Sequence, residues 1–394
     1  MEKYLMISIC LLMGVLILIN FRKLNKKINQ VNQKLGIETE NVSEKMNDSE
    51  KVTSDQKELV TPDKNVVQEK DVVQTIPVPT TELEGNLKEN VSTEEQKVIP
   101  KVDFKLSQTR VQGLSHKKAK PPIPCQDYGK AGILSNGFHV ILVSDGAGSS
   151  KLSHVASEFC VNTLYSHLQV FDFSNLIPNP EQPELLQKNW NKAVFELFER
   201  TRNALLNLSK ENNVHPTDLY CTLLLVIKTD WGFLSANIGD GRSGVSAGKP
   251  CSLSVPLQTF TAGATFFLIK EGWENIFRAY TMIIQDWSKV KYFFATTDGC
   301  QDFVMDWSEK GPRQGIYDNV LGDEARYDHN VPYEAFFDGL LASLNEIDDE
   351  KERNERLRRL VENGIYLLSG EEKELKSISD PLLDDDKTFI IFHV

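Results

Sequence analysis

The sequence lacks any closely spaced pair of cysteines. Its six cysteines are scattered along the chain, and none forms a C-x-x-C pair. This spacing disfavours a zinc site and agrees with a reducing compartment. The cysteines within the folded part are expected to be small buried residues or to lie at strand ends. They are Cys125, Cys160, Cys221, Cys251 and Cys300.

An excess of basic charge is also missing. The formal net charge of the chain is −12 at pH 7. A protein that binds duplex nucleic acid needs a basic face to displace counterions from the phosphates. Nucleic acid is therefore not expected to be the main partner.

Aromatic residues are absent from residues 22–103. Within this stretch, residues 38–99 contain 15 Asp or Glu against 7 Lys, a local balance of −8. Such a segment cannot bury enough apolar surface to offset the entropy lost on folding. We expect residues 22–101 to form a disordered acidic linker. Its start contains a short heptad pattern, Leu24, Ile28, Val31 and Leu35, which favours a short solvated helix and leaves a dimerising coiled coil open.

The chain begins with an apolar run. Tyr4 to Ile19 contains no charge and is followed by Arg22, Lys23, Lys26 and Lys27. Its length is at the short end for a membrane-spanning helix. A cleaved signal peptide would need a basic leader and a small-residue cleavage site, and neither is present. The positive-inside rule places the following residues in the cytoplasm, so residues 1–21 are predicted to be a single-pass transmembrane anchor.

The folded domain is expected over residues 102–394. Ser153 to Val170 and Gln187 to Lys210 carry apolar residues at helical spacing, and two more helices are expected at Pro332 to Ile347 and Asp348 to Asn363. Short β-branched or aromatic segments bounded by turn residues predict strands. The expected strands are Phe138 to Val143, Leu219 to Thr229, Gly232 to Ile238, Ala264 to Ile269, Lys291 to Thr296 and Thr388 to Val394. This mixture predicts an α+β sandwich.

Acidic turns follow several of these apolar runs. A strand that ends in a Gly-permitted turn can carry its aspartate to a point where other carboxylates converge. Converging carboxylates repel one another unless a cation lies among them, so a site for a hard divalent metal is the first hypothesis. The four turns are Ser144-Asp145-Gly146, Gly239-Asp240-Gly241, Thr297-Asp298-Gly299 and Asp384-Asp385-Asp386.

The order of these motifs resembles the type 2C family of metal-dependent serine/threonine protein phosphatases, in their bacterial form. The resemblance covers the chain from about Thr109 to its end, in five blocks. It implies a β-sandwich flanked by helices in four α/β/β/α layers, with two Mg²⁺ or Mn²⁺ ions at one end and room for a third. The blocks are Gly113 to Asp127, Ser144 to Gly148, Gly239 to Arg242, Thr297 to Asp302 and Asp385 to Thr388.

The resemblance assigns roles to individual residues. Asp145 matches the carboxylate that bridges the two ions, and the carbonyl of Gly146 matches a ligand of the second ion. Asp298 and Asp385 match the carboxylates that complete the first ion's shell. The alternative for Asp145 is a hairpin turn in which its side chain caps a backbone amide. The alternative for the other two is a solvated acidic loop before an edge strand. Asp386 would orient its turn.

Three further acidic residues match positions near the second ion and a third ion. Asp127 follows Gln126 where many relatives carry Glu-Asp, so the second ion would have one anionic ligand fewer unless Asp127 takes over. Asp240 and Asp302 match positions that bind a third, looser ion in bacterial relatives, and structural turn roles are equally compatible with them.

Two positions bear on the treatment of the substrate phosphate. Family members use an arginine shortly before the first acidic pair, and His116 is the candidate here, with Arg110 or Lys117 as substitutes. A protonated histidine can serve as a donor, although an ordinary loop residue is an alternative. Ala147 stands where eukaryotic relatives carry a histidine that is thought to protonate the leaving group. Metal-bound water or solvent would supply that proton instead.

The expected function is metal-dependent hydrolysis of phosphoserine or phosphothreonine in proteins, in membrane-tethered cytoplasmic signalling. Two bound ions would activate a water and clamp the oxygens of an in-line displacement. The expected partners are phosphoprotein substrates and a cognate serine/threonine kinase. Two alternatives stay open: a catalytically weak or inactive binding module with this fold, and a membrane scaffold that acts through its linker.

Overall fold

The computed structural model describes residues 102–179, 181–254, 257–259, 265–305, 325–327, 331–363, 365–368, 371–374 and 384–394. The predicted anchor at 1–21 and linker at 22–101 lie outside these ranges and stay predictions. Among the residues that are described, no helix has both the length and the apolar character needed to cross a bilayer.

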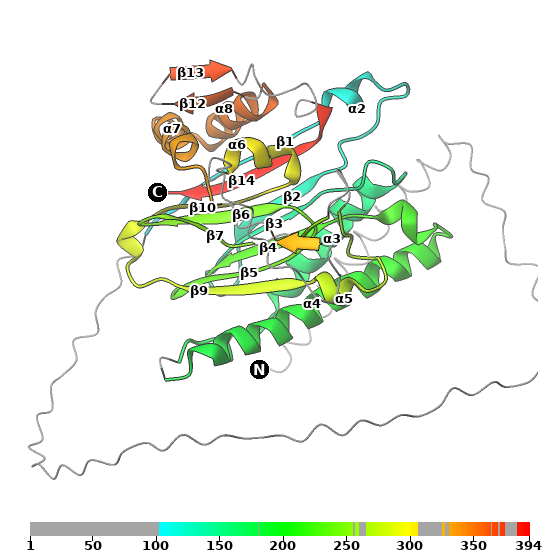
Figure 1. Ribbon diagram of the computed structural model, residues 1–394, viewed down its shortest axis with the longest axis horizontal. Helices are drawn as coiled ribbons and strands as arrows, with labels where there is room; N and C mark the ends of the chain where they lie inside the picture. The colour runs from blue at the N-terminus through cyan, green and yellow to red at the C-terminus, as the bar shows by residue number, and fades with distance from the viewer. Residues whose placement is uncertain are drawn as a thin grey trace, which may run out of the picture. The chain divides into compact units, whose positions relative to one another are not determined.

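Two five-stranded antiparallel sheets form the middle of the domain (Figure 1). The first sheet has the order β1-β14-β10-β6-β7 and the second the order β2-β3-β4-β5-β9. The strands of the first are β1 Lys105–Val111, β14 Lys387–His393, β10 Val290–Thr296, β6 Arg242–Ala247 and β7 Pro250–Ser252. Those of the second are β2 Tyr128–Ile133, β3 His139–Ser144, β4 Leu223–Lys228, β5 Gly232–Ile238 and β9 Arg278–Ile283. Two smaller pairs join β8 Leu257–Thr259 to β11 Ala325–Tyr327 and β12 Ile365–Leu368 to β13 Glu371–Glu374.

Helices cover the outer faces of both sheets, with α3 and α4 on the second sheet and α7 and α8 on the first (Figure 1). The described α-helices are α2 Leu114–Lys118, α3 Ser153–Gln169, α4 Pro183–Glu211, α5 Trp273–Ile276, α6 Gln301–Val304, α7 Glu334–Asn345 and α8 Glu350–Glu362. The 3-10 turns are η2 Pro216–Leu219, η3 Trp287–Lys289 and η4 Asp298–Cys300. The predicted α+β class and its four layers are confirmed.

Side chains of β10 and β14 alternate between two apolar cores. Phe293 and Phe392 are paired across the strands and stack at 5.0 Å between the two sheets. Tyr292 faces the other way and stacks on Phe337 of α7 at 4.2 Å. Because successive residues of a strand point to opposite faces, a strand buried on both sides is apolar throughout. These two strands therefore form the centre of a sheet that is covered on both faces.

Two sequence expectations about the elements are wrong. The strand expected at Ala264 to Ile269 is irregular from Thr265 and then turns, with the Leu268 amide bonded to the Cys221 carbonyl at 3.0 Å. This one bond docks the segment beside β4 without building a ladder. The strand expected from Leu219 begins only at Leu223, because Pro216 opens the turn η2.

Candidate metal centre

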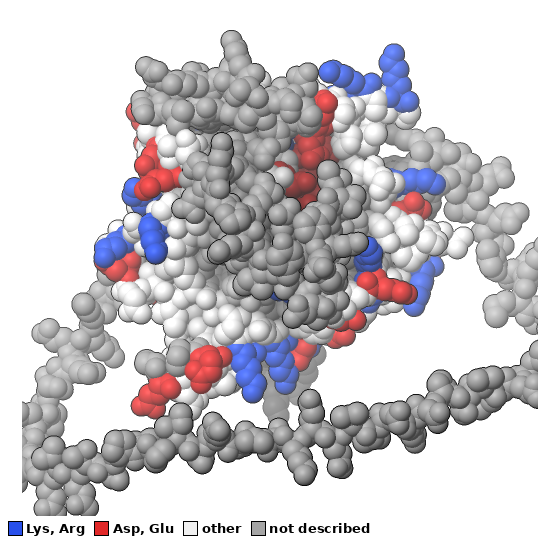
Figure 2. Space-filling model, viewed as in Figure 1, with Lys and Arg blue, Asp and Glu red and all other residues white. Residues whose placement is uncertain are grey.

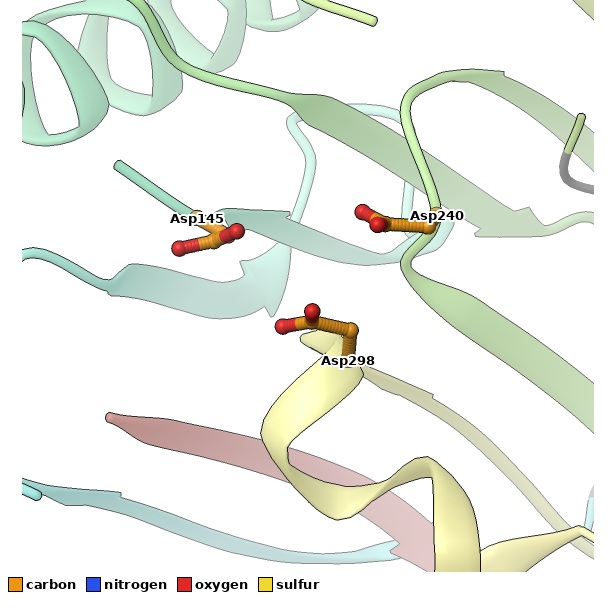
Figure 3. A group of neighbouring side chains, drawn as sticks. All are labelled: Asp145, Asp240 and Asp298. Carbon is orange, nitrogen blue, oxygen red and sulfur yellow. The ribbon is translucent and has the colours of Figure 1, made fainter. Parts of the chain in front are cut away.

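Three aspartates from separate elements meet at one end of the two sheets. Asp145 follows β3, Asp240 lies in the turn from β5 to β6, and Asp298 opens η4 after β10. One carboxylate oxygen from each lies within 4.8 Å of the others. Figure 3 shows the three side chains directed into the same space. The convergence predicted from the acidic turns is thus observed for these three residues.

Thr222 connects two of the three turns. Its hydroxyl accepts a hydrogen bond from the Asp145 amide at 2.9 Å, and its own amide donates to the Asp145 carbonyl at 2.8 Å. Gly239 packs on the same residue, where a Cβ would lie 2.4 Å from Thr222 Cγ2, and its φ of +100° also favours glycine. The turn that bears Asp240 is thereby held against the residue that fixes Asp145.

The charges of the cluster act strongly on one another. Burial raises the pKa of Asp145 well above its usual range, and the negative charges of Asp127 and Asp240 raise it further. Burial raises the pKa of Asp298 in the same way, with Asp240 and Asp145 adding to the shift. A divalent cation among these groups would favour their charged forms.

Asp127 lies beside the three aspartates and is fully enclosed. The Thr297 hydroxyl donates to its Oδ2 at 2.6 Å. Burial raises the pKa of this carboxyl well above its usual range, although the bond from Thr297 lowers it in part. Its Oδ1 and the Oδ1 of Asp240 are buried and accept no hydrogen bond from the described residues. A buried carboxylate oxygen without a donor suits a metal ligand.

The turn of residues 384–386 brings a second set of carboxyl groups to the same place. Part of the Asp385 residue is exposed to solvent. Its negative charge nevertheless acts on both Asp145 and Asp298. Burial raises the pKa of Asp385, and the negative charge of Asp386 adds to the increase. The charge of Asp385 thus acts on the cluster, although its oxygens are not among those that lie within 4.8 Å of one another.

Asp386 orients this turn, as the sequence suggested. Its Oδ1 accepts from the Gly113 amide at 2.7 Å. Its Oδ2 accepts from the Gln126 amide at 2.5 Å and is 2.9 Å from Nδ1 of His116. A Cβ on Gly299 would lie 2.1 Å from the Asp386 carbonyl oxygen. The buried carboxylate therefore joins the turn to residues 113–126, while glycine is required on its other side.

His116, the candidate phosphate donor, is bonded to Asp386 through Nδ1, so only its Nε2 remains for a substrate. The two substitutes also have described partners. Arg110 donates to the Asp127 carbonyl at 3.4 Å, and Lys117 forms an ion pair with Glu362 at 2.7 Å. The role in phosphate binding stays a prediction for His116.

Gln126 and Ala147 depart from the family pattern, and both are buried. The Gln126 side-chain amide donates to the Ser153 hydroxyl at 2.7 Å. The Ala147 amide donates to the Tyr220 carbonyl at 3.0 Å. A Cβ on Gly146 would lie 2.7 Å from the Gln126 carbonyl oxygen, so this turn packs directly on the segment that precedes Asp127. The role of the Gly146 carbonyl as a metal ligand stays a prediction.

Asp302 belongs to α6, and its side chain lies outside the described residues. Its predicted role for a third ion therefore stays a prediction. Thr222 and Thr297 were not among the residues predicted for the site, although they form hydrogen bonds to Asp145 and Asp127. A threonine next to a buried strand or an Asp-Gly turn was the available signal, but threonine is also a common strand residue.

The donor set fits a hard divalent cation. All its side-chain ligand atoms are carboxylate oxygens, which Mg²⁺ and Mn²⁺ prefer. Two buried carboxylate oxygens of this group, one on Asp127 and one on Asp240, accept no hydrogen bond from the described residues. Asp145, Asp240 and Asp298 would hold cations of this kind, and the charges of Asp127 and Asp385 act on the same cluster. Among the described residues, no other group of three or more His, Cys, Asp or Glu forms a comparable cluster.

Comparison with known families identifies the class of protein that has this fold and centre. Residues 112–362 match the protein phosphatase 2C family, which is more than half of the chain. The chain belongs to the protein phosphatase 2C family. The prediction of a protein phosphatase is confirmed by this membership. The match ends before β14, so it does not include Asp385.

Several solved structures are similar to this chain. The serine/threonine phosphatase Stp1 from Staphylococcus aureus is 14% identical, with a TM-score of 0.44 over 74% of this chain and 96% of that one. The S. agalactiae serine/threonine phosphatase is 14% identical, with a TM-score of 0.45 over 74% of this chain and 100% of that one. A bacterial serine phosphatase is 13% identical, with a TM-score of 0.45 over 74% and 98%. No curated protein matches the sequence.

Proposed function

We propose that this protein is a metal-dependent phosphatase that hydrolyses phosphoserine and phosphothreonine in other proteins. The observation that carries the proposal is the convergence of Asp145, Asp240 and Asp298, whose oxygens lie within 4.8 Å of one another. Membership of the protein phosphatase 2C family supports the same conclusion. Mg²⁺ or Mn²⁺, when bound, would supply an activated water and neutralise charge on the phosphate.

The chain's own residues would hold the ions in place. Asp145, Asp298 and Asp385 are proposed for the first ion, and Asp127 with the Gly146 carbonyl for the second. The Thr297 hydroxyl donates a hydrogen bond to Oδ2 of Asp127, so Oδ1 is the oxygen that would bind the ion. Asp240 and Asp302 are proposed for a third ion. The count of two ions, or three, follows from the family pattern and not from the geometry.

His116 is proposed to contact the substrate phosphate. Its Nδ1 is bound to Asp386, which fixes the ring and leaves Nε2 as the atom that donates. Because Asp386 belongs to the turn that carries Asp385, this hydrogen bond joins the proposed phosphate contact to the ligand turn. This connection would position the phosphate against the ions.

Turnover of p-nitrophenyl phosphate by the full-length chain tests the proposal. Mn²⁺ or Mg²⁺ should produce turnover of this compound and of a phosphothreonine peptide, and EDTA should abolish both. The matched Asp145→Asn protein should be inactive while it keeps its fold. If the wild-type protein shows no metal-dependent, EDTA-sensitive turnover, the catalytic proposal is wrong.

A binding module without catalysis is the second candidate, and Gln126 favours it. This side chain is neutral and donates to Ser153, so it adds no anionic ligand to the second ion. Such a module would bind Mn²⁺ in a calorimetric titration but would release no phosphate. Turnover therefore separates the two candidates.

We also propose that residues 1–21 anchor the protein in the membrane, with the phosphatase domain in the cytoplasm opposite a serine/threonine kinase. The apolar run at Tyr4 to Ile19 and the basic residues after it support this. Protease added outside intact cells should leave the domain uncut. Cleavage of the domain under these conditions would rule out the cytoplasmic orientation.

A further inference from the structure

A basic loop lies beside the metal centre. We define the basic loop as residues 116–123, with the sequence His-Lys-Lys-Ala-Lys-Pro-Pro-Ile. Three of its eight residues are lysines, although the chain as a whole has a formal net charge of −12. A group of lysines on an acidic protein can simply be a solvated part of its surface. Whether these lysines can act on a substrate depends on where the loop lies relative to the metal centre.

The residues directly before the basic loop are attached to the turn that carries Asp385. The Ser115 hydroxyl donates to the Asp384 carbonyl at 2.6 Å, and the Gly113 amide donates to Asp386 at 2.7 Å. A Cβ on Gly113 would lie 2.1 Å from the Asp384 carbonyl oxygen, so the two segments are in direct contact. The start of the loop is therefore fixed relative to the metal centre.

The end of the basic loop is also fixed. The Ile123 amide donates to the His116 carbonyl at 3.1 Å, which closes the loop at its base. The Gln112 side chain donates to the Ile123 carbonyl. Pro121 and Pro122 restrict the backbone next to the last lysine. Because the loop is already ordered, a ligand that binds to it loses less conformational entropy.

The lysines of the loop differ in what they contact. Lys117 forms an ion pair with Glu362 of α8 at 2.7 Å. Lys118 and Lys120 are exposed, and neither forms an ion pair within the described part of the chain. In Figure 2, Lys and Arg atoms stand out over α2 at the upper right, next to a patch of Asp and Glu atoms. Two ammonium groups are thus available at the border of the acidic centre.

We propose that Lys118 and Lys120 select protein substrates that carry acidic residues near the phosphorylated residue. This inference rests on the proposed phosphatase function. With the phosphate at the metal centre, the flanking residues of the substrate would pass over the surrounding surface. The basic loop belongs to this surface, because His116 is bonded to Asp386 of the ligand turn. Glutamate or aspartate side chains there are attracted by the two ammonium groups, whereas lysine side chains are repelled.

The test compares three phosphothreonine peptides of equal length, with Glu, Ala or Lys at the positions on both sides of the phosphothreonine. With the full-length chain and Mn²⁺, kcat/KM should be about tenfold higher for the Glu peptide than for the Lys peptide. The difference should lie mainly in KM and should shrink at high ionic strength. Turnover of p-nitrophenyl phosphate, which has no flanking residues, provides the reference rate for the metal centre.

Charge reversal of the loop gives the sharper comparison. In the double variant Lys118→Glu/Lys120→Glu, the Lys peptide should become the better substrate, after each rate is divided by that for p-nitrophenyl phosphate. The matched control is Lys188→Glu/Lys192→Glu, which makes the same charge change on exposed residues of α4. This control should keep the wild-type preference for the Glu peptide.

Three results would overturn the inference while leaving the phosphatase function intact. The wild-type protein could turn over all three peptides equally, or the double variant could keep the Glu preference, or the α4 control could lose it. If p-nitrophenyl phosphate is not turned over, the proposed function fails instead. Fluorescence anisotropy of the labelled peptides then still decides on the loop, because binding needs no turnover, and equal affinities would reject it.

A lipid surface is the competing occupant of the basic loop. Because the proposed anchor would bind either kind of vesicle, the contact is measured as the difference in sedimentation between phosphatidylcholine vesicles with and without phosphatidylserine. If the Lys118→Glu/Lys120→Glu variant loses binding to phosphatidylserine but keeps the wild-type peptide preference, the loop binds lipid and the inference is wrong. A peptide preference that reverses, with vesicle binding unaltered, supports it.

Discussion

The two sheets hold their acidic turns in different ways. The Asp145 turn is fixed by Thr222, which precedes the neighbouring strand of the same sheet. The turn of residues 384–386 is fixed by the Asp386 carboxylate and by contact with Gly113 and Gly299, which come from distant parts of the chain. Both sets of contacts come from beside neighbouring strands of the same sheet. The first turn is held through its backbone by one threonine, whereas the second is held through the Asp386 side chain and by close backbone contact with two glycines.

This difference separates two kinds of failure. Loss of the carboxylate from the first turn should abolish catalysis without unfolding the domain, because the turn is held by its backbone. A change around the second turn should reduce stability and activity together, because the same contacts carry both. Four experiments test this comparison.

The largest effect is expected from Asp145→Asn. Removing the Asp145 carboxylate should lower kcat by on the order of a thousandfold, because the bound cation would lose a ligand. The free energy of unfolding without metal should stay equal or rise, because the repulsion that raises the pKa of Asp145 is relieved. Phosphate release and urea unfolding measure the two quantities. A large loss of stability would show that Asp145 holds its turn as well as the ion.

Gly299→Ala should have the next largest effect, on the second turn. The new Cβ would lie 2.1 Å from the Asp386 carbonyl oxygen, so the backbone must shift. The expected cost is about 3 kcal/mol of unfolding free energy, with a loss of activity. The control is Gly148→Ala. Apart from its chain neighbours, Gln126 Oε1 at 3.9 Å is the only heavy atom of the described residues within 4 Å of that Cβ. Equal stability of the two variants would contradict the proposed close contact.

A pH titration examines the far end of the strand that follows the second turn. His393 of β14 is buried between Ser107 and Asn345, and burial lowers its pKa from 6.5 to about 4. The unfolded chain therefore binds a proton between these values that the folded protein does not, so stability falls as the pH falls through this window. From the shift, His393 costs about 2 kcal/mol at pH 5 relative to pH 8.

His393→Gln isolates this contribution from the carboxylates that titrate nearby in pH. The unfolding free energy of the variant should change less between pH 8 and pH 5 than that of the wild-type protein. The charges of Arg353 and Lys105 act in the same direction as burial on this histidine. An unaltered pH dependence in the variant would mean that the buried ring is not the cause.

The smallest effect is expected from a matched pair of threonine variants. Thr222→Val removes one acceptor, that of the Asp145 amide, and should cost about 1 kcal/mol. Thr297→Val removes the donor to Asp127 and the acceptor of the Thr388 amide, and should cost about 2 kcal/mol. Chemical denaturation measures both. The comparison of the two turns fails if Thr222→Val is the more damaging change.

Much of the fold was predictable because strands and helices have local signatures. Gly232 to Ile238 was predicted with the bounds it has, and both long helices were predicted within a few residues. The edge strand β9 was missed, because its alternation of small, aromatic and polar residues is weak and it is paired on one side only. The strand expected at Ala264 to Ile269 was wrong, because apolar residues also occur in turns that pack on the domain core.

The convergence of carboxylates was predictable where an aspartate ends a strand, as with Asp145 and Asp298. Asp240 was assigned a looser role, yet it lies in the central cluster with them. The partnership of His116 with Asp386 could not be foreseen, because 270 positions separate the two residues in sequence. Contacts of this kind depend on the register of β1 against β14, which no local pattern encodes.

That register has a consequence for how the protein is made. β14 lies between β1 and β10, and it pairs with the earliest described strand of the domain. A nascent chain on the ribosome therefore cannot close the first sheet, or bring residues 384–386 to Asp145, until β14 has been synthesised. Translation that stops early would release a chain with neither a finished core nor a working centre, so premature phosphatase activity is excluded by the order of synthesis.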